Sequence, residues 1–380
     1  STLFLYTTLF RSGCQRSGAA CKTKPACPGL DASGRKADYG TRLSMDAFAN
    51  DTPANRDEAF RQAEAELGFA KAIVEKDFWV CWSLQNLFAL PSFGDHLIFK
   101  GGTSLSKAYD VIHRFSEDVD LSLDRAQLGF EGDSDPENPD LTGGKRKSLL
   151  QDLQEAAEAA VAGPLLDEIN TAFSNSLEQP FSLQIDENDP QTILFAYPAL
   201  GDDDPGYIKP IVRFEFGARG AQLPAEQRTL STYVQQAFPD LSGLNGVEVH
   251  TLGIERTFWE KATILHMLFH QNTSKPLADR MSRHYYDMAQ LAQHDAKARA
   301  LANLDLLSEV GHHKSVFFKA AWARYEDAKP GSLRLVPSAE LEPALRRDYA
   351  GMREMIMGDA PSFDDVMNAI AALEAEINAA

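Results

Sequence analysis

Residues 99–123, FKGGTSLSKAYDVIHRFSEDVDLSL, contain the pattern that decides the fold. Apolar and polar side chains alternate over the last six of these residues, which predicts a half-buried strand. Residues two apart in a strand face the same side, so Asp118 and Asp120 project together. Two neighbouring carboxylates repel each other unless a divalent cation lies between them. The stretch therefore predicts a strand that carries a metal-binding pair.

A glycine pair precedes this strand, between a short expected strand (96–100) and an expected helix (103–113). Thr103 or Ser104 is the expected N-cap of that helix. Glycines let the backbone approach a phosphate, and a helix start offers free N–H groups to it. Lys107 lies about one turn further and is also able to reach a phosphate. The phosphate-binding candidates are Gly101, Gly102, Thr103, Ser104 and Lys107.

The rest of the chain divides into a mixed front half and a helical back half. Helices are expected at 54–90 and 145–178, around a Gly/Asp/Pro-rich loop at 129–144. Further strands are expected at 181–186, 191–197, 208–217 and 247–252. Helices follow at 254–271, 279–294, 296–325 and 338–380. We predict an α/β (α+β) fold with a mixed sheet flanked by helices, followed by a C-terminal helical domain. The expected domains are 45–252 and 253–380.

The first 44 residues lack this periodicity, and we interpret them as a non-native or disordered leader. Met45 is then a plausible start. A signal peptide is the competing interpretation, because residues 3–10 are apolar, but a basic segment before them is missing.

Composition narrows the function further. The 380 residues carry a formal net charge of −18, so any contact with nucleic acid must be local. We find no run of 18 apolar residues and expect no membrane span. Four cysteines, three of them before residue 28, argue against a disulfide framework and favour the reducing cytoplasm. The three early cysteines are loosely spaced, without a nearby histidine, and do not favour a metal site.

In order, the segments FKGGTSLSKAY and RFSEDVDL resemble the signature of the polymerase-β-type nucleotidyltransferase superfamily. The sequence of these segments is most similar to the AbiEii-type toxins of bacterial abortive-infection systems, and the resemblance covers most of residues 65–295. It implies a nucleotidyltransferase-type sheet, a nucleoside triphosphate (NTP) substrate and Mg²⁺ (or Mn²⁺). It also implies an acceptor that is often the tRNA 3′ end, and a winged-helix antitoxin encoded nearby, as in type IV toxin–antitoxin pairs.

The resemblance adds four residues to the expected site. Superfamily members use a third carboxylate from a nearby strand, and Glu215 in the alternating segment 211–216 is the candidate. A surface ion pair with a neighbouring arginine is the alternative for Glu215. Lys261 within Trp-Glu-Lys matches a functional lysine of AbiEii-like proteins. The resemblance implies that it holds the triphosphate or stabilises the charge on it. Asp287 would orient Lys261 or position the acceptor, and Arg283, one helical turn before it, would bind nucleotide or pair with Asp287.

Other interpretations keep the same site. Nucleotide transfer onto a protein hydroxyl, or onto a small molecule such as an antibiotic, would use the same carboxylates. A catalytically dead nucleotide-binding module is a third possibility. His266 and His270 are expected to be ordinary helix residues, and the basic run 145–147 is expected to start a solvated helix.

Overall fold

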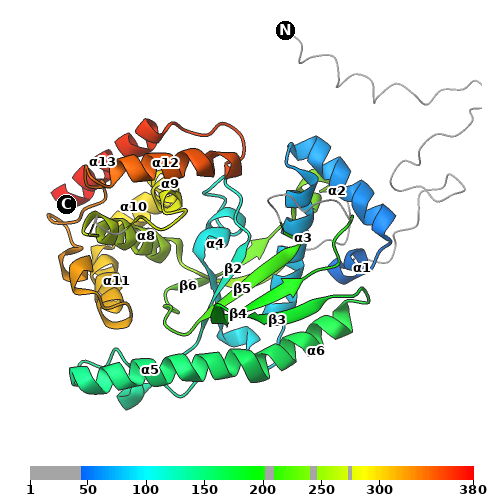
Figure 1. Ribbon diagram of the computed structural model, residues 1–380, viewed down its shortest axis with the longest axis horizontal. Helices are drawn as coiled ribbons and strands as arrows, with labels where there is room; N and C mark the ends of the chain where they lie inside the picture. The colour runs from blue at the N-terminus through cyan, green and yellow to red at the C-terminus, as the bar shows by residue number, and fades with distance from the viewer. Residues whose placement is uncertain (1–43, 202–208, 240–245, 273–275) are drawn as a thin grey trace, which may run out of the picture. The chain divides into compact units, whose positions relative to one another are not determined.

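The computed structural model describes residues 44–201, 209–239, 246–272 and 276–380, which belong to one compact unit. Its strands are β1 (Leu97–Lys100), β2 (Asp118–Leu123), β3 (Ser182–Asp186), β4 (Asp189–Ala196), β5 (Ile211–Gly217), β6 (Ala225–Leu230) and β7 (Val247–Leu252). They form one sheet in the order β3-β4-β5-β2-β1-β7-β6 (Figure 1). β2 is parallel to β5 and β1 to β7, while the other neighbours are antiparallel. The mixed sheet flanked by helices confirms the expected fold class.

Three N-terminal helices pack beside the sheet: α1 (Met45–Ala49), α2 (Pro53–Leu67) and α3 (Lys71–Phe88). Gly68 ends α2 in the left-handed conformation, with φ of 75°, and so divides the expected helix 54–90 in two. Trp79 and Trp82 of α3 are fully buried and pack on the ring of Phe195 from β4. This aromatic cluster anchors α3 against the sheet.

The helix after β1 is shorter than expected. α4 covers Gly101–Lys107 rather than 103–113, and Lys100 is its N-cap, so the prediction of Thr103 or Ser104 as the cap is wrong. Beyond Lys107 the chain leaves the helix and its apolar side chains, Ile112 among them, join the core of the C-terminal helices. Tertiary packing therefore overrides the helical pattern of this segment.

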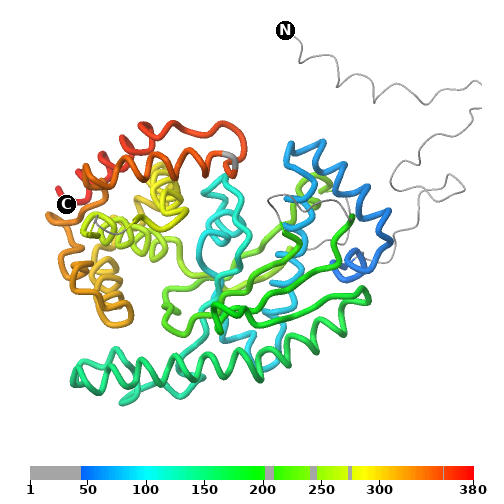
Figure 2. Tube along the Cα trace, viewed as in Figure 1, coloured from blue at the N-terminus to red at the C-terminus, as the bar shows by residue number. Residues whose placement is uncertain are grey.

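The expected helix 145–178 is interrupted once. α5 (Gly143–Ala160) and α6 (Leu166–Ser176) are joined by a π-helical turn, Val161–Leu165. Pro164 lacks a backbone N–H, and Gly163 has non-helical angles, which accounts for the kink. Figure 2 shows that the segment still follows one continuous path along the sheet. A short helix, α7 (Tyr233–Ala237), follows β6.

The C-terminal part contains α8 (Ile254–Phe269), α9 (Ser282–Leu291), α10 (Ala296–Leu301), α11 (Leu304–Phe317), α12 (Glu342–Met352) and α13 (Phe363–Ala379). Among its described residues the only β-structure is an isolated bridge from Ile356 to Arg114. These helices share a second apolar core that also includes Leu105 and Tyr109 of the front half. The helical back half is confirmed, whereas the domain boundary at residue 252 stays a prediction.

The remaining sequence expectations concern single features. No helix in the described ranges is long and apolar enough to cross a membrane. Cys81 is buried, which raises the pKa of its thiol to about 12. The other cysteines and the leader lie outside the described residues. His266 bonds to backbone groups of Arg324 and Arg334, as an ordinary helix histidine does.

Candidate active site

Three carboxylates lie on one face of the sheet where β2 meets β5. Asp120 pairs with Glu215 in the parallel register, and Asp118 pairs with Arg213. The Nε atom of Arg213 is 3.7 Å from Asp118 Oδ1 and 3.5 Å from Glu215 Oε1. The structure thus brings all three expected carboxylates together, and it also contains the Arg–Glu pair considered as an alternative for Glu215.

The negative charge of the carboxylates on this face is only partly balanced by neighbouring cations. Burial, with repulsion from Glu117 and Asp120, raises the pKa of Asp118. Burial, with repulsion from Asp120 and Asp118, also raises the pKa of Glu215. Within the described residues, no three or more His, Cys, Asp or Glu side chains form a group that could hold a metal ion. The donor chemistry, carboxylate oxygen only, nevertheless suits Mg²⁺ or Mn²⁺.

The glycine pair lies directly against these acids. Gly101 has φ of 78°, and a Cβ atom placed on it would lie 1.8 Å from Asp120 Oδ2. A Cβ atom on Gly102 would lie 2.8 Å from the Nη2 atom of Arg114. Side chains at either position would displace a charged group of the site, so both glycines are needed for close packing.

The hydroxyl groups of Thr103 and Ser104 in α4 form hydrogen bonds within the protein. Thr103 is buried, and its Oγ1 donates to the carbonyl oxygen of Asp118 and lies 2.9 Å from Ser116 Oγ. Ser104 Oγ donates to the carbonyl of Gly101 at 3.0 Å. Both residues therefore support the backbone next to the carboxylates rather than presenting a free donor there.

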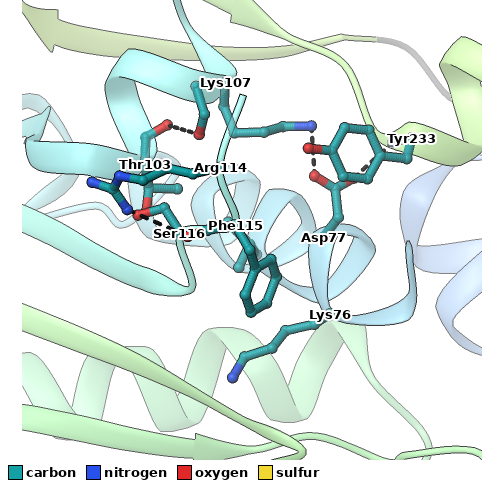
Figure 3. Close-up of a pocket in the computed structure, with 10 residues that line it drawn as sticks. Lys76, Asp77, Thr103, Lys107, Arg114, Phe115, Ser116 and Tyr233 are labelled. Atoms are coloured by element: carbon teal, nitrogen blue, oxygen red, sulfur yellow. Dashed lines mark hydrogen bonds and ion pairs between the residues drawn. The ribbon is translucent and has the colours of Figure 1, made fainter. Parts of the chain in front are cut away.

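The Lys107 side chain points toward Asp77 and the ring of Tyr233 (Figure 3). Its Nζ atom lies 2.6 Å from Asp77 Oδ1 on α3 and 4.2 Å from the ring centre of Tyr233. It also donates to the carbonyl of Ser231 at 2.7 Å. Burial opposes the charge of Lys107, but Asp77 raises its pKa, so the lysine stays protonated in this pair. The structure does not bring Lys107 to the expected phosphate site.

Lys261 and Asp287 meet in a buried charge network behind the glycine pair. Lys261 Nζ lies 2.9 Å from Asp287 Oδ2. Arg114 binds the same carboxylate through Nε at 2.7 Å and Nη2 at 2.8 Å. Burial alone would raise the pKa of Asp287, but Arg114 and Lys261 lower it far below its ordinary value. Asp287 is therefore an ionised carboxylate that holds two cations in place.

Arg283 does not form the pair with Asp287 that was the alternative to nucleotide binding, since Arg114 and Lys261 occupy both carboxylate oxygens. Its positive charge, like that of Arg213, instead opposes the rise in the pKa of Asp118. Within the described chain, Arg283 has no ion-pair partner inside 4 Å.

Sequence reasoning missed Arg114. Arg114 lies within the quoted stretch, but its partner Asp287 is 173 residues away, so no local pattern in the sequence indicated the pair. Lys76 of α3 is buried and binds Glu117 at 2.5 Å, next to Asp118. Its neighbours Glu75 and Asp77 are buried too, so the segment Glu75-Lys76-Asp77 belongs to the support of the site.

Comparison with known proteins gives one family match. Residues 82–369 match the model described as nucleotidyl transferase AbiEii toxin, type IV TA system. No curated protein matches the chain. Among solved structures, the chain is similar to MenT4, a nucleotidyltransferase toxin from Mycobacterium tuberculosis H37Rv. The identity is 20% and the TM-score 0.40, over 84% of this chain and 98% of that one.

Proposed function

The chain belongs to the AbiEii family of nucleotidyltransferase toxins of type IV toxin–antitoxin systems, and from this premise we propose its reaction. It transfers a nucleotide from an NTP to the 3′ end of tRNA. The observation that supports the site is the surplus of negative charge where Asp118, Asp120 and Glu215 share one face. Such a surplus favours a divalent cation, which in turn attracts phosphate even to an acidic protein.

Asp118, Asp120 and Glu215 are the proposed ligands of Mg²⁺ or Mn²⁺. A bound ion would polarise the donor phosphate and make the attacking hydroxyl more acidic. Arg213 lies between two of these carboxylates but has a stronger partner in Asp186, at 2.7 Å. That contact gives the guanidinium a place to remain when a metal ion takes up the carboxylates.

The donor triphosphate is proposed to bind beside Gly101 and Gly102, where the backbone carries no side chain. Lys261 and Arg283 would bind its negative charge, because Lys261 shares Asp287 with Arg114, which lies against Gly102, and Arg283 is unpaired among the described residues. Asp287 acts as a positioning residue that holds Lys261. In this proposal residues 45–252 form the catalytic domain, and the helical domain 253–380 contributes Lys261, Arg283 and Asp287.

The reaction forms a bond between the acceptor hydroxyl oxygen and the α-phosphorus of the NTP. The bond from the α-phosphorus to its bridging oxygen breaks, and pyrophosphate leaves. Glu215 is the proposed acceptor of the hydroxyl proton, because it lies beside Asp120 on the carboxylate face where the acceptor hydroxyl would attack. Arg283 and Lys261 stabilise the charge on the leaving pyrophosphate.

A toxin of a type IV system implies an antitoxin partner. We propose that the partner is a winged-helix protein encoded nearby, and that the toxin acts in the cytoplasm, where its tRNA acceptor is found.

The test incubates the purified full chain with Mg²⁺, each labelled NTP in turn, and total tRNA. Label should appear on tRNA from one preferred NTP. The double variant Asp118→Asn/Asp120→Asn should lose at least about 10³-fold in rate, since both carboxylates proposed to hold the metal ion against the phosphate are gone. The matched control is Asp133→Asn/Asp140→Asn, which removes two exposed carboxylates from the loop before α5 and should keep full activity.

Each other outcome changes the proposal in a defined way. Label on the toxin or on a lysate protein would replace tRNA with a protein hydroxyl as the acceptor. NTP binding without transfer to RNA, protein or antibiotic would favour a nucleotide-binding module. Absence of Mg²⁺-dependent NTP binding would contradict the proposed site itself.

A further inference from the structure

His284 of α9 contacts the lysine of the proposed donor site. Its Nδ1 atom is 3.3 Å from Lys261 Nζ, and the same Nζ atom lies 2.9 Å from Asp287 Oδ2. Lys261 and Asp287 are buried, whereas His284 is only half-buried. The imidazole ring is therefore the part of this hydrogen-bonded group that is most open to a ligand.

The positions of the protons in this contact follow from the chemistry of the two groups. Burial lowers the pKa of Lys261, but the ionised Asp287 opposes the loss of its proton, so Lys261 is an ammonium group. An ammonium nitrogen donates and never accepts, so His284 Nδ1 is the acceptor and carries no proton. Burial and the charge of Lys261 lower the pKa of His284 well below its ordinary value, so the ring is neutral at pH 7. Its single proton is therefore on Nε2.

The Nε2–H group of His284 has no partner within the part of the chain that the structure describes. The ring makes one hydrogen bond there, from Lys261 to Nδ1. An ammonium group has three N–H bonds, and those of Lys261 are accepted only by Asp287 and His284 among the same residues. Each of the two neighbouring side chains, Lys261 and His284, thus keeps one unused N–H donor.

No acceptor is left beside these donors. Asp287 is fully buried, and its oxygens accept from Arg114 at 2.7 and 2.8 Å and from Lys261. Because two cations share one carboxylate, the group keeps a positive charge. A phosphate meets both conditions, since its oxygens accept hydrogen bonds and carry negative charge. A ribose hydroxyl fits less well, because its own proton would find no acceptor in Asp287.

A series of contacts connects His284 to the proposed triphosphate site. Arg114, which shares Asp287 with Lys261, lies 2.8 Å from the position that a Cβ atom on Gly102 would occupy. The glycine pair borders the proposed metal ligands, where the α-phosphorus would react. The part of the NTP beyond the α-phosphorus is pyrophosphate, so pyrophosphate is the part that the donors beyond Gly102 would meet.

We propose that His284 is a substrate-binding residue, whose Nε2–H group donates to a pyrophosphate oxygen of the NTP. Lys261 imposes the tautomer that this contact needs, and His284 in return fixes the direction of the ammonium group. This inference rests on the proposed function and deepens it, because it gives the leaving pyrophosphate a neutral donor in addition to the cations.

Two amide substitutions separate the roles of the two ring nitrogens. In His284→Asn the amide oxygen replaces Nδ1 and still accepts from Lys261, but the second donor is lost. In His284→Gln the longer side chain carries an amide N–H to the place of Nε2, but the acceptor for Lys261 is lost. Calorimetry measures the binding of inorganic pyrophosphate to the full chain with Mg²⁺. His284→Asn should weaken it about tenfold, as expected for one hydrogen bond to a charged group, and His284→Gln should stay within about threefold of the wild type.

The same titration with AMP, CMP, GMP and UMP tests the position of the contact. These ligands lack pyrophosphate, so their affinities should stay within about twofold in His284→Asn, because no hydrogen bond to them is lost. In the transfer assay KM for NTP should rise about tenfold with kcat nearly unchanged, since the bond is present before and during the reaction. His250→Asn changes an exposed histidine of β7 and is the matched control, with no change expected in any of these quantities.

Heteronuclear NMR of the histidine rings reports the tautomer directly. The signals of His284, assigned by their loss in His284→Asn, should show a proton on Nε2 and none on Nδ1 at pH 7. Lys261→Met removes the ammonium group while Arg114 still pairs with Asp287, and both tautomers should then be populated. A proton on Nδ1 in the wild type would contradict the inference, because the outward nitrogen would then have nothing to donate.

The outcomes distinguish this inference from the proposed function. Transfer to tRNA with unchanged pyrophosphate affinity in His284→Asn would overturn the role of His284 and leave the proposed function intact. Weaker binding of the monophosphates instead of pyrophosphate would also overturn it, and so would an equal loss in His284→Asn and His284→Gln. Pyrophosphate binding that His284→Asn alone weakens, in a wild type that transfers nothing to tRNA, would support the inference and contradict the proposed reaction.

Discussion

The carboxylates on β2 and β5 and the carboxylate on α9 respond to burial in opposite ways. Burial and mutual repulsion raise the pKa values of Asp118 and Glu215. Asp287 is more deeply buried, yet its pKa is lowered, because Arg114 and Lys261 lie within 2.9 Å of its oxygens. The nearest cation to Asp118 is Arg213, at 3.7 Å, which also contacts Glu215 and Asp186.

The difference separates two uses of buried charge. A carboxylate whose oxygens are fully paired holds other groups in position and contributes to stability only while both partners remain. Carboxylates that lack cations are destabilising by themselves and gain from a ligand that supplies positive charge. Substitution of a fully paired carboxylate should mainly reduce the stability of the fold. Substitution of a carboxylate that lacks cations should mainly reduce the rate of nucleotide transfer.

The largest expected effect is that of Asp287→Ala. The change leaves Arg114 and Lys261 buried without their shared carboxylate, which should cost about 3–5 kcal/mol of unfolding free energy. Urea unfolding at neutral pH measures the loss. Asp133→Ala, in an exposed loop, is the control and should stay within about 0.5 kcal/mol of the wild type. A loss below about 1 kcal/mol for Asp287→Ala would mean that the network is not structural.

Gly101→Ala is expected to have a smaller effect on stability and a clear effect on transfer. Its Cβ atom would meet Asp120 Oδ2, and a carboxylate displaced by about 1 Å should reduce the transfer rate roughly 100-fold. Gly129→Ala is the matched control, because Gly129 has a similar φ of 88° but nothing lies within 4 Å of its Cβ position. Equal transfer rates in the two variants would contradict the close approach of Gly101 to the acids.

The smallest expected effect is the pH dependence of stability, which should have opposite signs in the two regions. The pKa of Asp118 is raised in the folded state, so the ionised form is penalised above that pKa and relieved as pH falls through it. Asp118→Asn should therefore stabilise the metal-free protein at pH 7, by less than about 1 kcal/mol, and the gain should shrink toward about pH 4.

For Asp287 the sign is reversed. Its folded pKa is lowered, so its stabilisation is fully present above the ordinary value of 3.8 and is lost only as pH falls further, through the folded pKa. Asp287→Asn should thus be destabilised equally between about pH 5 and 8. Urea unfolding between about pH 4 and 8 measures both variants. A loss for Asp287→Asn that shrinks over the same pH range as the gain for Asp118→Asn would contradict the opposite directions of the two pKa shifts.

Much of the site could be predicted from local pattern. The alternation in residues 118–123 and in 211–216 places acids on one strand face because side chains alternate strictly along a strand. The turn at the glycine pair could also be predicted locally, since only glycine adopts the φ of residue 101 without strain. Helix ends were less predictable: residues 108–113 have a helical pattern but pack into the C-terminal core instead.

Partners of charged residues could not be predicted in the same way. Helical spacing suggested Arg283 for Asp287, but the partner is Arg114, which is 173 residues away in the chain. Spacing suggested that Lys107 reaches the phosphate site, but Asp77 on α3 binds it instead. In both cases the actual ion pair joins residues of separate elements, which only tertiary packing brings into contact.

The sequence by itself determined which residues share a face: Asp118 with Asp120, and Arg213 with Glu215, because strand geometry depends only on neighbours along the chain. The tertiary structure alone decided that β2 and β5 are parallel and in register, so that Glu215 lies beside Asp120. It also decided that Arg114 and Lys261 share Asp287. Such pairings depend on the free energy of burying whole elements together, which no short segment of sequence contains.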